Sequence, residues 1–222
     1  MTAAPQPDPW YPRRAFMVEA QLRERGLRDA RVLAAMQKVP RHEFVAPDLR
    51  DQAYDDHPLP IGHGQTISQP YIVAAMLEAL ALRPVDVVLE VGSGCGYQTA
   101  LLCELCARVY SMEVFAELAA FARQTLERLG YRNAEVVVGD GTLGLPDKAP
   151  FDAIVVSAAA PHVPASLFEQ LKEGGRLIIP VGPELLQELQ LVRKLEGKPE
   201  VTHLDGCRFV PLVGKEGFAG RY

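Results

Sequence analysis

Short apolar runs alternate with amphipathic segments through the middle of the chain. Five runs have the length and β-branched composition of buried strands, at residues 85–91, 108–112, 134–138, 151–157 and 176–180. The segments between them predict helices at residues 97–107, 115–129 and 166–171. Repeated strand–helix units predict an α/β fold with a doubly wound, mostly parallel sheet and right-handed crossovers.

The two ends of the chain depart from this alternation. Residues 1–10 are rich in proline, so we expect a loose arm there. Helical patterns follow at residues 11–25, 30–39 and 72–80. Gly26 ends the first of these helices, and Asp29 can cap the second. Towards the other end, antiparallel strands that close the sheet edge are expected at residues 189–195, 201–204 and 208–213. Because no domain boundary interrupts the chain, residues 1–222 are expected to form a single domain.

Residues 45–70 have neither helical nor strand periodicity and are rich in Asp, Pro and Gly. A long irregular loop in a compact domain is often functional, although an ordered surface loop would give the same pattern. Pro70 suits the first turn of the helix that follows, so Ser68 or Gln69 could serve simply as its N-cap. The sequence physics alone favours the role of helix cap for Ser68 over a role in a functional loop.

The bulk composition limits the class of protein. The chain has 222 residues, of which 48% are hydrophobic and 23% charged, typical of a soluble globular domain. The net charge is −5 without a basic block, which argues against nucleic acid as a partner. No apolar run approaches the ~18 residues of a membrane span, and no signal pattern opens the chain, so we expect a cytoplasmic protein without membrane association. Cys103 and Cys106 fall in an apolar helix without a second ligand pair, so buried thiols and no metal site are expected.

A glycine-rich turn joins the first predicted strand to its helix. Glu90 precedes three alternating glycines, Gly92, Gly94 and Gly96, which would let a ligand approach the backbone N–H groups at a helix N-terminus. A dinucleotide fold would place its glycines as G-x-G-x-x-G, and the Glu90 carboxylate would oppose a phosphate but suit a cationic ligand. A glycine-rich turn that binds nothing is the alternative.

Acidic residues fall at the ends of the first three predicted strands. Besides Glu90 these are Glu113, placed to accept the hydroxyls of a ribose, and Asp140, which with Gly141 is placed to receive an adenine amino group. Any one of them could be solvated or capping, and a ribose acid fits NAD equally well. Together with the glycine turn they favour a nucleoside site.

Several segments resemble the protein-L-isoaspartate O-methyltransferase family. The resemblance rests on the segments 58–70, 90–96, 109–113, 139–141, 149–154, 158–161 and 174–182. The block Gln65-Thr66-Ile67-Ser68-Gln69-Pro70 makes it specific, because methyltransferases in general share only the glycine turn and the acids. The resemblance implies a class I methyltransferase fold of Rossmann-like type.

The resemblance also implies a chemistry and its residues. S-adenosyl-L-methionine would be the cofactor, S-adenosyl-L-homocysteine its product, and damaged proteins or peptides containing L-isoaspartyl residues the substrates. Ser68 matches the active-site position, and Thr66 and Ile67 lie in the same cofactor-contacting stretch. The methyl acceptor would be a free α-carboxylate, already ionised at pH 7, so no general base is required. The ester could then cyclise and reopen as normal aspartate.

Recognition of such a substrate must rest on main-chain groups, because the side chains beside a damaged residue vary. The loop at residues 58–69, with Ile61 and Gly62, and the extended segment Val210, Pro211 and Leu212 are the expected clamp. We expect the protein to act as a monomer. Two other functions stay open at this point: methylation of another carboxylate or small molecule, and a non-catalytic nucleotide-binding module.

Overall fold

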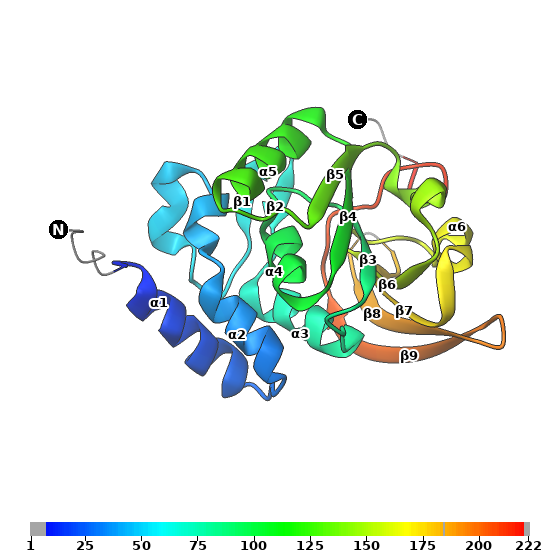
Figure 1. Cartoon of the computed structure of the whole chain (residues 1–222), viewed down its shortest axis with the longest axis horizontal. Coiled ribbons are helices and arrows are strands. Elements are labelled where there is room, and N and C mark those ends of the chain that lie inside the picture. Colours follow the sequence, from blue (N-terminus) through cyan, green and yellow to red (C-terminus); the bar gives the residue numbers. More distant parts are fainter. Residues whose placement is uncertain (1–7, 184, 220–222) are drawn as a thin grey trace.

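A seven-stranded sheet forms the centre of the molecule in the computed structural model, which describes residues 8–183 and 185–219 (Figure 1). Its strands are β3 (Val87–Val91), β4 (Arg108–Glu113), β5 (Ala134–Val138), β6 (Phe151–Val156), β7 (Leu171–Val181), β8 (Gln187–Leu195) and β9 (Lys198–Cys207). They lie in the order β5-β4-β3-β6-β7-β8-β9, parallel from β5 to β7 and antiparallel at β8 and β9. The predicted fold is confirmed, including its antiparallel closing strands.

Helices cover both faces of this sheet. The longer ones are α1 (Tyr11–Phe16), which continues as the π-helical segment η1 (Met17–Arg23), α2 (Ala30–Lys38), α3 (Pro70–Leu80), α4 (Tyr97–Leu105) and α5 (Ala116–Arg128), with the short α6 (Ala165–Glu169). Helices α2 to α5 form the larger core with one face of the sheet, and α6 packs on the other (Figure 1). As predicted, the Asp29 carboxylate caps α2, accepting hydrogen bonds from the N–H groups of Arg31 and Val32.

Strand β3 is apolar at every position except Glu90. Val88 packs into the core beneath α3, α4 and α5, whereas Leu89 and Val91 pack into the core on the opposite face. Because successive side chains of a strand point to opposite faces, a strand covered on both sides favours apolar residues at consecutive positions. Val85 precedes the strand and is 73% exposed, so the strand begins two residues later than predicted.

The order of the strands places a crevice beside β3. The chain runs outward from β3 to β4 and β5, then returns to place β6 against the other side of β3. Neighbouring crossovers therefore diverge between β3 and β6, and a ligand crevice opens at the carboxyl ends of strands at such a switch point. The glycine turn after β3 lies at this position.

Three predictions for irregular segments need correction. Residues 45–70 contain a hairpin of β1 (Leu59–Gly62) and β2 (Gln65–Ile67), besides the 3₁₀ turn η3 (Pro47–Gln52). Another 3₁₀ turn, η2 (Arg41–Phe44), comes directly before them. Residues 208–213 form no strand and take part in two isolated bridges, between Pro211 and Ala159 and between Val213 and Phe218. Residues 1–7 lie outside the described part, but Trp10 is not loose, because its ring stacks on His42 with centroids 4.8 Å apart.

Asp86 anchors the start of β3. Its buried carboxylate accepts hydrogen bonds from the backbone N–H and Nε of Arg83 and, at 2.6 Å, from Nη2 of Arg176 on β7. Burial alone would raise the pKa of Asp86, but these hydrogen bonds outweigh burial and hold the pKa below its ordinary value. The ionised carboxylate therefore stabilises the folded state.

We expect Asp86→Asn to lower the free energy of unfolding at pH 7 by about 3–5 kcal/mol, because Arg176 then stays largely buried without its anion. The depressed pKa means that the Asp86 contribution is complete at neutral pH and is lost as the pH falls below 3.8. Urea unfolding at several pH values measures the difference, with Asp147→Asn on the exposed turn η5 (Pro146–Lys148) as control. If the difference in free energy of unfolding between Asp86→Asn and wild type does not shrink in acid, the ionised Asp86 does not stabilise the fold in this way.

Candidate active site

The glycine turn leaves β3 in a left-handed conformation. Gly92, Gly94 and Gly96 have φ values of 92°, 51° and 90°, which side chains rarely tolerate. The N–H groups of Gly92 and Ser93 donate to the carbonyl oxygen of Met112 at the end of β4. The turn is thereby held against the neighbouring strand.

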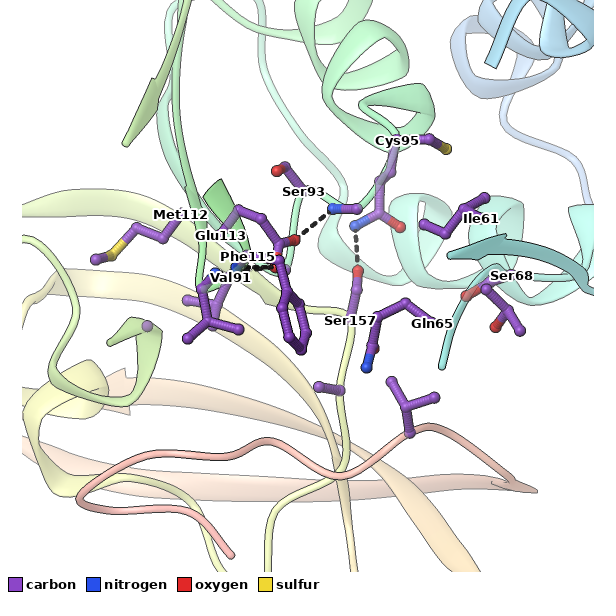
Figure 2. Close-up of a pocket in the computed structure, with 18 of the residues that line it drawn as sticks. Ile61, Gln65, Ser68, Val91, Ser93, Cys95, Met112, Glu113, Phe115 and Ser157 are labelled. Atoms are coloured by element: carbon purple, nitrogen blue, oxygen red, sulfur yellow. Dashed lines mark hydrogen bonds between the residues drawn. The ribbon is translucent and has the colours of Figure 1, made fainter. Parts of the chain in front are cut away.

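A cavity of about 440 Å³ opens at this turn, at the carboxyl ends of β3 and β4 (Figure 2). Eleven of the predicted site residues line it: Ile61, Thr66, Ile67, Ser68, Gly92, Gly94, Glu113, Gly141, Val210, Pro211 and Leu212. Figure 2 shows Met112, Glu113 and Phe115 on one side and Ile61 and Ser68 on the other. The volume is in the range of small-molecule sites.

Four other predicted residues do not line the cavity. Gly62 lies in the hairpin turn with φ of 95°, where its conformation rather than a ligand accounts for the glycine. Gly96 packs on α5, since a Cβ atom there would lie 3.0 Å from Cβ of Ala122. Glu90 and Asp140 make other hydrogen bonds, described below, and their contacts with a cofactor stay predictions.

Glu113 faces the cavity and also holds it together. One carboxylate oxygen, Oε2, accepts a hydrogen bond from the N–H of Gly94 at 2.8 Å, and Oε1 accepts from the N–H groups of Val114 and Phe115 at 2.9 and 3.1 Å. Two carboxylate oxygens offer about four acceptor positions, so at least one remains for a ligand hydroxyl. The side chain is positioned as predicted for a ribose contact.

Glu90 is buried beneath the turn instead of facing a ligand. Its Oε2 accepts hydrogen bonds from the hydroxyls of Thr99 and Ser111, both at 2.5 Å, and Oε1 has no partner among the described residues. Burial raises the pKa of Glu90 to about 7, against the opposing effect of the two hydroxyls. β3 directs this side chain towards α4 and away from the cavity lining, and its contact with a cationic ligand stays a prediction.

Asp140 forms hydrogen bonds with its own turn and with the segment at Lys215. Its carboxylate accepts hydrogen bonds from the N–H groups of Thr142, at the start of η4 (Gly141–Leu143), and Lys215, both at 2.9 Å. Burial opposes these bonds, yet they lower the pKa of Asp140. Only the neighbouring Gly141 lines the cavity, where a Cβ atom would lie 2.5 Å from Cγ1 of Val91.

Ser68 follows β2 and does not cap α3. The N-cap residue of α3 is Gln69, and it makes no side-chain capping bond. The Ser68 hydroxyl has no hydrogen bond to another described residue, while its carbonyl oxygen accepts one from Arg41 at 2.8 Å. The capping alternative is therefore wrong for Ser68, and the hydroxyl is available to a ligand.

A second hollow, a groove of about 1460 Å³, adjoins the cavity. It runs between α3 and the segment 204–211, and the exposed Leu185 and Leu186 lie along it. Five residues line both hollows: Thr66, Ser68, Ser157, Val210 and Pro211. The two hollows thus share a wall that includes Ser68.

Several lining residues escaped the sequence reasoning. Ser157 follows β6 and accepts a hydrogen bond from Nε2 of Gln98 at 2.7 Å across the cavity (Figure 2). Phe115 stacks on His63, with ring centroids 4.9 Å apart. The position of Ser157 at the end of a strand next to β3 was a usable signal, whereas the contact with His63 depends on the hairpin and had none.

Other features of the described residues concern metals and membranes. No group of three or more His, Cys, Asp or Glu side chains in the described part could hold a metal ion. Cys103 and Cys106 are free thiols, and burial raises the pKa of Cys106 to about 12. None of the helices in that part is long and apolar enough to cross a membrane.

The sheet order, the glycine turn and the acid at the end of β4 define a class I methyltransferase. The family model described as protein-L-isoaspartate(D-aspartate) O-methyltransferase matches residues 13–217. The chain belongs to this family.

Similar proteins match this chain along almost its whole length. The chain is 57% identical over 219 residues to a protein-L-isoaspartate O-methyltransferase of Koribacter versatilis, covering 99% of both chains. A protein of the same name from Methanoculleus marisnigri is 55% identical, and the match covers 96% of this chain and 97% of that protein. Among solved structures, a Plasmodium falciparum chain in complex with S-adenosyl-L-homocysteine has a TM-score of 0.80 and 28% identity, over 90% of this chain and 98% of that one.

The buried Glu90 predicts an unusual dependence of stability on pH. Its folded-state pKa of about 7 lies above the ordinary 4.5, so the folded state keeps a proton that the unfolded state has lost between these values. Wild-type stability should therefore fall as the pH rises through this window, by up to about 1.4 kcal/mol per pH unit.

Glu90→Gln removes this titration. Its stability relative to wild type should increase from pH 4.5 to about 7 and then level off. Urea unfolding across this range measures the trend, and Glu200→Gln on the exposed strand β9 is the matched control. If the difference in free energy of unfolding between Glu90→Gln and wild type is constant across this pH range, the pKa of Glu90 is not raised.

Proposed function

We propose that this chain methylates the free α-carboxylate of L-isoaspartyl residues in damaged proteins and peptides, with S-adenosyl-L-methionine in the cavity and the peptide in the groove. The observation that carries the proposal is the shared wall: the cavity suited to the cofactor and the groove suited to a polypeptide meet at Ser68. Family membership supports both the cofactor and the substrate class.

The residues around the cavity fit the proposed cofactor. Glu113 would accept the ribose hydroxyls, while Gly92 and Gly94 would let the amino-acid moiety approach the turn. Gly141 lies where the adenine is expected, near the apolar Met112 and Leu212. Thr66, Ile67 and Ser68 would close the cavity from the side of the groove. When bound, the cofactor supplies an electrophilic methyl group.

The peptide would bind along main-chain groups of the groove. Val210 and Pro211 lie on the shared wall, and the segment is held by hydrogen bonds of Ala159, whose N–H donates to Val210 and whose carbonyl accepts from Leu212. An extended segment recognises another chain through backbone groups with little dependence on side chains. Ile61 on β1 would complete the clamp from the opposite side.

No side chain has to remove a proton in this reaction. The acceptor carboxylate is already ionised at pH 7, so the site must align it and exclude water. The Ser68 hydroxyl, which has no other partner among the described residues, would donate a hydrogen bond to one carboxylate oxygen and leave the other to attack. Alignment of this kind can lower the activation free energy by up to ~7–11 kcal/mol.

The rest of the proposal concerns the state of the protein. The family model covers residues 13–217 as one unit, and we infer a single domain that acts as a monomer. A cytoplasmic location is supported by the four cysteines, which are all free thiols, since oxidising compartments favour disulfides.

We expect Glu113→Ala to raise the Kd for S-adenosyl-L-homocysteine at least ~10-fold, because charge-assisted hydrogen bonds worth about 1.5–3 kcal/mol each are lost. Calorimetric titration measures the affinity, and Glu127→Ala on the outer face of α5 is the control. Glu113→Gln keeps the shape of the side chain and one acceptor oxygen, so its Kd should lie between those of the wild type and Glu113→Ala. An unchanged Kd for Glu113→Ala removes this residue from the cofactor site.

Paired peptides test the reaction itself. With labelled cofactor, kcat/KM for an isoaspartyl peptide should exceed that for the matching L-aspartyl peptide by ~100-fold or more, because a carboxylate displaced by one methylene misses the attack geometry. Several flanking sequences should be accepted. Equal methylation of both peptides would indicate a general carboxyl methyltransferase, and cofactor binding without turnover would indicate a binding module.

A further inference from the structure

Arg41 is a fully buried cation behind the wall shared by the cavity and the groove. Its side chain leaves η2 with no exposed surface. Nε donates to the carbonyl oxygen of Ala53 at 2.7 Å, and Nη2 donates to the carbonyl oxygen of Ser68 at 2.8 Å. The guanidinium also lies over the ring of Tyr97, 4.9 Å from its centroid.

No anion of the described residues compensates this charge. Arg41 pairs with no Asp or Glu side chain there, and its buried Nη1 has no hydrogen-bond partner. Burial lowers the pKa of Arg41, but arginine stays protonated at neutral pH. Arg14 provides the contrast: it is nearly as buried, yet it pairs with Asp8 at 2.6 Å and bonds the hydroxyl of Tyr54. A buried charge without a counter-ion is costly to folding, so a role in stability alone does not explain it.

Both groups that Arg41 contacts on this side belong to the site. Ser68 lines the cavity and the groove, and Tyr97 lines the cavity. We propose that Arg41 is a positioning residue for methyl transfer: it fixes the main chain of Ser68, and its charge attracts the acceptor carboxylate to that position. This inference rests on the proposed function and deepens it.

The charges of the reaction explain why the cation lies behind Ser68. A lone pair of the carboxylate oxygen forms the new C–O bond while the C–S bond breaks and its electron pair stays on sulfur. An anion and a sulfonium cation thus become a neutral ester and a neutral thioether. A guanidinium bound directly to the carboxylate would stabilise the charge that the reaction consumes. From behind Ser68, Arg41 attracts the carboxylate without occupying its attacking lone pair.

The geometric and electrostatic parts of this role can be separated. Arg41→Lys keeps the charge but loses the planar fork that holds two carbonyl oxygens. It should lower kcat at least ~10-fold and leave KM for the isoaspartyl peptide within about threefold. Arg41→Met loses the charge as well, so it should also raise that KM at least ~10-fold. In both variants the Kd for S-adenosyl-L-homocysteine should stay within about threefold of wild type, because Arg41 does not line the cavity.

A double-mutant cycle with Ser68→Ala distinguishes positioning from a general loss of structure. Arg41→Lys acts through Ser68, so in the Ser68→Ala background it should lower kcat by less than about threefold. Arg14→Lys is the matched control, a buried arginine without contact to Ser68, and should lower the melting temperature without changing kcat. The Arg41→Lys cycle decides the positioning role even where Arg41→Met does not fold.

Three results would overturn the inference. Independent, multiplicative effects of Arg41→Lys and Ser68→Ala would show that Arg41 does not act through Ser68. A parallel loss of melting temperature, S-adenosyl-L-homocysteine affinity and kcat in Arg41→Lys would assign it to folding alone. An unchanged peptide KM in folded Arg41→Met would remove the electrostatic part. Failure of the wild type to methylate isoaspartyl peptides would instead refute the proposed function.

Discussion

The hydrogen bonds between the glycine turn and the end of β4 hold the candidate site together. The N–H groups of Gly92 and Ser93 reach the carbonyl of Met112, and that of Gly94 reaches the carboxylate of Glu113. The glycines in this turn have positive φ angles, which other residues rarely adopt. The acid that faces the cavity therefore also sets the spacing of its two walls, so binding and shape depend on one side chain.

The sequence was sufficient to predict the sheet, because its parallel strands are buried on both faces and their composition is locally visible. Strand β5 has the predicted bounds, and the acids were correctly placed at the carboxyl ends. Their side-chain directions were not predictable at that level. Glu90 lies one residue before the end of β3 and points into the core, whereas Glu113 ends β4 and reaches the cavity. Both side chains lie on the same face of the sheet, because Glu90 pairs with Ser111 and Glu113 follows Ser111 by two residues. They differ because Glu113 lies beyond the level at which β3 ends.

The missed elements depend on contacts between distant segments. The hairpin of β1 and β2 turns through Gly62, His63 and Gly64, all with positive φ, and its short strands contain Pro60, which weakens any strand pattern. The segment with Pro211 pairs with Ala159, beyond the end of β6, and with Phe218. Such pairings follow from the tertiary arrangement and not from local periodicity.

The start of α3 shows how local stability and function compete at Ser68. A side-chain cap at a helix N-terminus typically contributes about 0.5–2 kcal/mol, and both Ser68 and Gln69 precede the helix without providing one. Pro70 at the first helical position has no N–H group, so one of the donors that a cap would satisfy does not exist. With this demand reduced, the Ser68 hydroxyl can face the shared wall while its carbonyl is held from behind by Arg41. The residue that sequence physics favoured as a cap is thereby available to orient an acceptor.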